Sequence, residues 1–176
     1  MEHEMSETRS TMRRILDPHL SPQVYSDLLW QDLTRTANAA YHDGDIHNAS
    51  QGYNAALGEA ERLLAVSEEI DTPCNAAVLL VISHHNLAEL ALAQGHSKRA
   101  LHHFHIPFEC LLSLASLPST PPVLRHSCTA SLKEATIALA THLQTCGAPA
   151  PIIADTINRA KCVATALSSI APRARS

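Results

Sequence analysis

Residues 37–57, ANAAYHDGDIHNASQGYNAAL, decide how the rest of the sequence is interpreted. Small residues stand at helical spacing on both sides of Gly44, and Asp45 follows that glycine directly. A glycine just past the end of a helix suits the left-handed backbone conformation that stops helices. The stretch therefore predicts the end of one helix, a tight turn and the start of a second helix.

The same pattern returns twice further along the chain. Gly95 lies 51 residues after Gly44, and Gly147 lies 52 residues after Gly95. Seven residues before the three glycines stand Ala37, Ala88 and Ala140. Since small residues let two helices approach closely, each glycine is expected to join a pair of packed helices.

Start signals precede each pair of helices. Ser21-Pro22, Thr72-Pro73 and Thr120-Pro121 each place a hydroxyl before a proline. A capping hydroxyl accepts a free backbone N–H, and proline in the first turn loses no hydrogen bond. We expect each Ser or Thr to cap a helix that the proline begins.

These signals predict an all-α fold of three antiparallel helical hairpins with six main helices, because no stretch alternates as a strand does. The second helices are expected at about 45–70, 96–117 and 149–169. The expected organisation is an N-terminal arm or short capping helix at 1–20, one repeat domain at 21–170 with units at about 21–70, 72–117 and 120–169, and a tail at 171–176.

Residues 37–57 and the stretch NLAELALAQGHSKRALHHF at 86–104 resemble the tetratricopeptide repeat, TPR. The resemblance covers 22 to about 169, with the third unit matching in its first helix. It implies a right-handed α-solenoid whose concave groove binds an extended or helical segment of a partner. A standard TPR unit has about 34 residues, so the helices here are expected to be longer by one to two turns.

The resemblance also places candidate residues in that groove. Asn38 and Asn86 match two asparagines of a known TPR clamp for a peptide carboxylate, but Thr34, Glu134 and Ala138 occupy its basic positions, so that ligand is not expected. A mixed polar and apolar set favours a peptide or helix over a phosphate. The candidate groove residues are Gln31, Thr34, Asn38, Tyr41, His85, Asn86, Glu89, Leu92 and Thr141.

Composition narrows the class of function. A net charge of −4 without a Lys/Arg-rich run argues against nucleic acid, and the longest apolar run, residues 76–82, is too short for a membrane span. The N-terminus does not resemble a secretory signal. No nucleotide-binding, zinc-protease or nucleophile-elbow motif occurs. We therefore expect a cytoplasmic interaction module without catalysis or cofactor, with a protein or peptide as its partner.

Three alternatives remain open at this stage. The first is a secretion-type TPR chaperone of similar length. The second is a metal-binding or sensor protein, in which His85, His102 and His105, three of the 12 histidines, converge on an ion. Ordinary surface or core histidines are the simpler explanation of this cluster. The third is a homodimer through one end of the solenoid, where Ile152, Ile153, Val163 and Leu167 are expected to be partly exposed.

Overall fold

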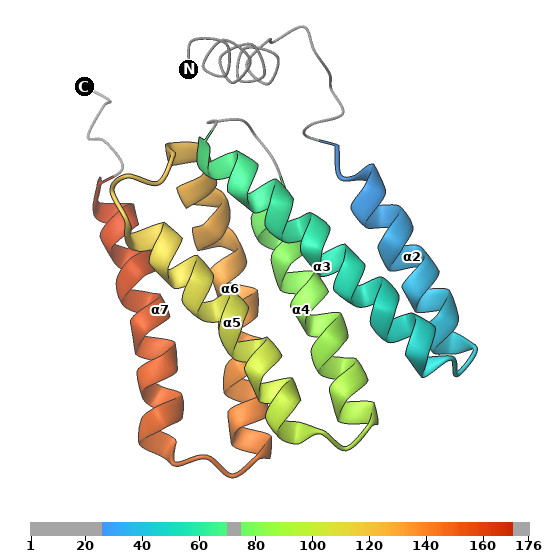
Figure 1. Ribbon diagram of the computed structural model, residues 1–176. Helices are drawn as coiled ribbons and strands as arrows, with labels where there is room; N and C mark the ends of the chain where they lie inside the picture. Colours follow the sequence, from blue (N-terminus) through green and yellow to red (C-terminus); the bar gives the residue numbers. More distant parts are fainter. Residues whose placement is uncertain (1–25, 70–74, 171–176) are drawn as a thin grey trace, which may run out of the picture.

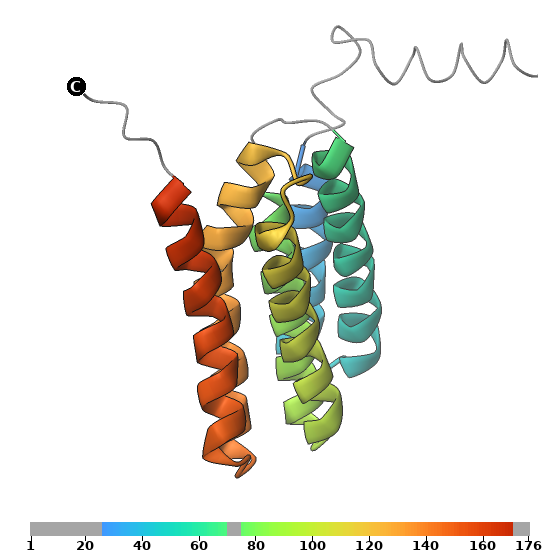
Figure 2. The same cartoon turned by 90° about the vertical axis from the view of Figure 1, so that its left-hand side faces the viewer.

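The computed structural model describes residues 26–69 and 75–170, and these form six α-helices without a strand (Figure 1). The all-α class and the number of main helices are thus confirmed for the described residues. The helices lie side by side with their long axes nearly parallel (Figures 1 and 2). They are α2 (Leu28–His42), α3 (Ile46–Glu69), α4 (Ala76–Ala93), α5 (Ser97–Ser116), α6 (Pro122–Thr145) and α7 (Ala150–Ile170).

The three glycine turns have one geometry and lie at the same end of the molecule (Figure 1). Gly44, Gly95 and Gly147 have φ values of 78°, 75° and 71°. In the first turn, the N–H of Asp45 donates to the carbonyl of Ala40 at 2.9 Å. Gly44 donates to Tyr41 at 3.1 Å, and the same two bonds recur in both other turns. The glycine prediction is confirmed, because this bond pair requires a left-handed residue.

The predicted capping by Thr120 is wrong. Helix α6 begins at Pro122, and Pro121, with φ −51° and ψ 139°, occupies the cap position. A residue that precedes a proline is disfavoured from the helical conformation, so Pro122 keeps Pro121 extended and moves the start of the helix by one residue. Thr120 is buried in the loop instead. Ser21-Pro22 and Thr72-Pro73 lie outside the described residues.

Helix α4 forms the centre of the core. It contacts α3, α5 and α6, and Trp30 of α2 donates a hydrogen bond from its indole nitrogen to the Ser83 hydroxyl of α4 at 2.8 Å. Among the described helices, α4 alone is long and apolar enough to cross a membrane, but 61% of it is buried inside the structure. A buried core helix passes the same test, so this composition is consistent with a soluble protein.

An ion pair fastens α7 to α5. The guanidinium of Arg159 donates to both carboxylate oxygens of Glu109 at 2.7 Å, and its carbon lies 5.4 Å from the centre of the Phe108 ring. Arg159 holds the pKa of Glu109 below its usual value. A bidentate pair of this kind fixes relative orientation as well as distance.

Helices α2 and α3 approach each other closely at Gly52 of α3. A Cβ atom at this position would lie 2.8 Å from the Cβ and 3.2 Å from the Cα of Ala37 on α2. Gly58, six residues further along the same helix, has nothing within 4 Å of its Cβ position. Packing between α2 and α3 thus requires a glycine at position 52, whereas Gly58 only weakens its helix.

We expect Gly52→Ala and Gly58→Ala to change the free energy of unfolding in opposite directions. The first forces α2 and α3 apart and destabilises the protein by about 1–3 kcal/mol. The second removes backbone entropy from the unfolded chain and stabilises by roughly 0.5–1 kcal/mol. Urea unfolding followed by circular dichroism measures both. Equal effects of the two substitutions would contradict the close approach.

Candidate functional site

A hollow of about 680 Å³ opens between α4, α5 and α6, close to the glycine turns. Four predicted groove residues meet there, namely His85, Glu89, Leu92 and Thr141. We call this feature the α4–α6 hollow. Its lining consists of His85, Glu89, Leu92, Ser97, Phe104, Ala138, Thr141, His142, Thr145 and Cys146.

Aromatic rings form much of this hollow. The Phe104 ring lies 5.5 Å from His85 and 5.1 Å from His142, measured between ring centres. The Nε2 atom of His85 is buried without a hydrogen-bond partner. Burial lowers the pKa of His85, while the carboxylates of Glu134 and Glu89 act in the opposite direction. A neutral imidazole with an unused ring nitrogen therefore lies beside an exposed acidic residue, Glu89.

An apolar stripe leads along α4 into the hollow. Val78, Ile82 and Leu92 are 39%, 37% and 38% exposed. They share one face with His85 and Glu89, because steps of three and four residues return to the same side of a helix. The rest of α4 is largely buried, so this stripe is the surface that α4 presents to solvent.

The candidates on α2 do not join this hollow. The Asn38 amide oxygen accepts the Tyr53 hydroxyl at 2.8 Å, so it ties α2 to α3. Thr34 is buried, and Tyr41 packs against the small cluster around Ala37. The Gln31 amide donates to Asp27 at 2.9 Å on the exposed side of the helix.

Asn86 also stays outside the hollow. It is half-buried and lies one turn after Ser83, on the side of α4 that receives Trp30. The structure thus brings together the candidates on α4 and α6 that line the hollow, whereas it separates them from those on α2.

The three histidines considered as metal ligands point to different neighbours. His85 packs against Phe104, and His105 lies 3.5 Å from Glu109. His102 is exposed, and its ring centre lies 5.7 Å from that of His103. Within the described ranges, no group of three His, Cys, Asp or Glu residues is placed to hold a metal ion. The structure does not bring the predicted ligands together.

A buried histidine pair lies beneath the surface instead. The Nδ1 atoms of His84 on α4 and His103 on α5 are 3.2 Å apart, so one ring donates and the other accepts. Burial, followed by the proximity of His103, His102 and His85, lowers the pKa of His84 to about 4. Burial likewise lowers the pKa of His103. The pair is neutral at neutral pH.

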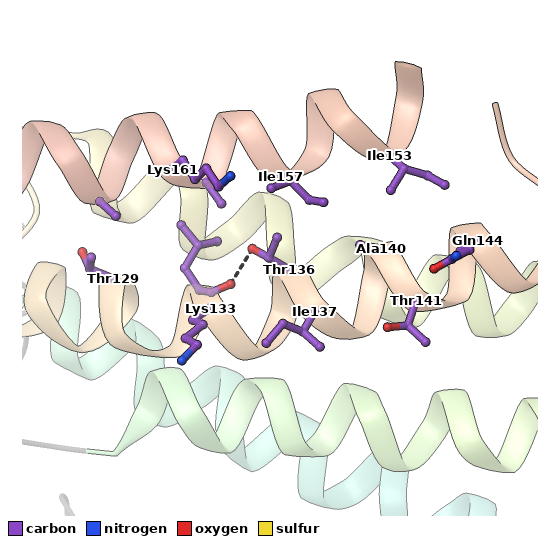
Figure 3. Close-up of a pocket in the computed structure, with 13 residues that line it drawn as sticks. Thr129, Lys133, Thr136, Ile137, Ala140, Thr141, Gln144, Ile153, Ile157 and Lys161 are labelled. Carbon is purple, nitrogen blue, oxygen red and sulfur yellow. Dashed lines mark hydrogen bonds between the residues drawn. The ribbon is translucent and has the colours of Figure 1, made fainter. Parts of the chain in front are cut away.

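A second hollow, the α6–α7 groove, contains one predicted groove residue, Thr141, but was otherwise missed by the sequence analysis (Figure 3). It has a volume of about 560 Å³, and its lining is mostly apolar. Ile137, which is 50% exposed, forms part of the α6 wall, and Ile157 forms part of the α7 wall. Lys133 and Lys161 are the charged residues of the lining, and both lie toward one end of the groove. Ile137 stands ten residues before Gly147, as His85 does before Gly95, so the repeat offset was the available signal.

Within residues 26–69 and 75–170, the chain forms six neighbouring α-helices, and the α4–α6 hollow and the α6–α7 groove lie on their surface. A family model described as "Protein of unknown function (DUF2753)" matches residues 28–173, so the chain belongs to this family. No curated protein and no solved structure matches the chain.

We expect the protein to lose stability on mild acidification because of the buried pair. The His84 pKa is 6.5 in the unfolded chain and about 4 in the folded protein, so between these values the unfolded state binds more protons. The free energy of unfolding therefore falls as pH falls, by roughly 2 kcal/mol for His84 between about pH 7 and about pH 5.

Urea titrations at several pH values measure this dependence. His84→Gln is expected to flatten it, whereas His126→Gln, at an exposed site on α6, should keep the wild-type slope. An identical slope in His84→Gln and wild type would show that the pair is not responsible.

Proposed function

We propose that the protein is a protein–protein interaction module that binds an extended or helical peptide segment along the exposed face of α4. The observation that carries this proposal is the apolar stripe of Val78, Ile82 and Leu92, which ends in the α4–α6 hollow. Apolar grooves with a few polar groups at the rim are the usual receptors for amphipathic segments.

The architecture supports a TPR-like solenoid as the framework for this surface. Three turns with one geometry recur at intervals of 51 and 52 residues. Helix α4 packs on α3 and touches α2 through Trp30, and α6 packs on both α4 and α5. In such a stack the first helices of successive hairpins line one face, and α4 is the middle one.

The chemistry of the hollow describes the segment that would fit. Leu92 and the Phe104 ring offer contact to an apolar anchor. The acidic groups nearby, Glu89 and Glu134, favour a cationic side chain next to that anchor, since opposite charges guide binding and its orientation. We expect a segment with apolar residues one or two turns apart and a Lys or Arg beside them.

Peptide display tests this proposal with ligands selected on the wild-type protein. Affinities of the selected peptides are then measured by fluorescence anisotropy for the double variant Ile82→Asp, Leu92→Asp. Two charges in the stripe are expected to weaken binding by about tenfold or more. Ile152→Asp, at a 50% exposed isoleucine of α7, is the matched control and should bind as wild type does.

Circular dichroism serves to check that the variants are folded. We expect them to fold, because Ile82 and Leu92 are both partly exposed. Peptides that bind the double variant and wild type equally would place the interface away from α4 and refute this site. Failure to select any peptide whose binding depends on Ile82 and Leu92 would count equally against the proposal.

A further inference from the structure

The residues of the α6–α7 groove occupy positions that are covered elsewhere in the fold. Fourteen residues before the turn glycines stand Trp30, Val81 and Lys133. Trp30 is 8% and Val81 is 2% exposed, whereas Lys133 is exposed. Trp30 of α2 contacts α4, the first helix of the next pair. Val81 lies on α4, and α4 contacts α6, the first helix of the third pair. The groove is therefore the place where a further first helix would pack.

The opposite end of the molecule shows the complementary feature on α2. Leu29 of α2 is 55% exposed, and the Asp32 side chain is 72% exposed. At the same distances before their glycines, α4 and α6 carry residues that are at most 3% exposed. These residues are Leu80 and Ser83 in α4, and Leu132 and Ala135 in α6. The face that the other first helices bury is thus open on α2.

We propose that a second copy of this chain binds in the α6–α7 groove through its helix α2, so that molecules associate head to tail. Such contacts join two different surfaces of one protein and therefore continue beyond a dimer unless the rotation closes a ring. The inference is independent of peptide binding, because none of these residues belongs to the α4 stripe.

Charge complementarity selects this occupant. Within one chain, the indole of Trp30 donates a hydrogen bond to Ser83. Trp30 stands 14 residues before its turn glycine, and Ser83 stands 12 residues before the next turn glycine. The same register between two molecules places Lys133 of one copy opposite Asp32 of the other. Lys133 and Lys161 have no ion-pair partner within residues 26–69 and 75–170, and the groove lining contains no acidic residue.

Asp32 is available for this contact. Its present partner is Arg35, three residues along the same helix, and both side chains are more than two-thirds exposed. Exposed pairs of this kind contribute little to stability. Asp32 can therefore leave Arg35 for the two lysines of the α6–α7 groove at little cost. The same contact would bury Leu29.

Sedimentation of the full chain over a range of concentrations tests the proposal. The weight-average mass is expected to rise beyond that of a dimer and to fall with added NaCl, which screens the ion pair. Asp32→Lys and Lys133→Glu each place like charges opposite one another and should weaken association by about tenfold or more. An equimolar mixture of the two variants should associate again, since each supplies the charge that the other needs.

Lys98→Glu, which changes the same charge at an exposed site on α5, is the control and should associate as wild type does. A monomer at the highest attainable concentration would overturn the proposal. So would a mass that stops at a dimer unaffected by Asp32→Lys, which would indicate a symmetric contact through another face.

Carbodiimide coupling identifies the occupant directly, because it joins a lysine to a carboxylate in contact. A cross-link between Lys133 or Lys161 and Asp32, formed between isotopically light and heavy copies, supports the proposal. A cross-link within one copy from either lysine to Glu2, Glu4 or Glu7 would instead assign the groove to residues 1–25 of the same chain.

Discussion

The left-handed glycine turn is the constraint on which the rest of the structure depends. A residue with φ near 75° lets the next N–H reach back to a carbonyl five residues earlier, and this bond sets the direction in which the chain leaves the helix. Because the geometry occurs at Gly44, Gly95 and Gly147, the same positions of each first helix face the second helix. Ala37 and Ala88 show the consequence, since both are almost completely buried. The central place of α4 follows, because α4 is covered by helices of all three pairs.

Among the described helices, this repeated arrangement exposes Asp32 on α2 at one end and Lys133 on α6 at the other. Lys133 on α6 occupies the position that Trp30 and Val81 occupy in the other two first helices, where both are buried. Asp32 on α2 occupies the position of the buried Ser83 and Ala135. Polar residues on terminal faces keep repeat proteins soluble. Here the two ends carry opposite charges, so the same substitutions that protect each face also make the faces complementary.

The sequence predicted the parts of the fold that depend on local bonds. The ends of α2, α4 and α6 were correct because the glycine turn is closed by hydrogen bonds within six residues. The start of α6 was wrong because two consecutive prolines compete for the first position, which a single Thr-Pro signal does not reveal. Four of the candidate groove residues, on α4 and α6, lie together in the hollow, and their role in binding stays a prediction. Asn38 and Thr34 were misplaced because the bond to Tyr53 and the burial of Thr34 are set by packing between helices.

His84 and His85 show how one step along α4 separates core from surface. His84 points to His103 in the interior, while His85 contacts Phe104, the residue after His103 on α5. Burial lowers the pKa of both imidazoles, so the free energy of unfolding falls as acid protonates the unfolded chain more readily than the folded one. A partner segment with apolar and cationic side chains, as proposed above, increases the burial of His85 when it covers Phe104 and His85, and so opposes the protonation of His85 further. By linkage, proton binding and partner binding at the α4–α6 hollow must then weaken each other.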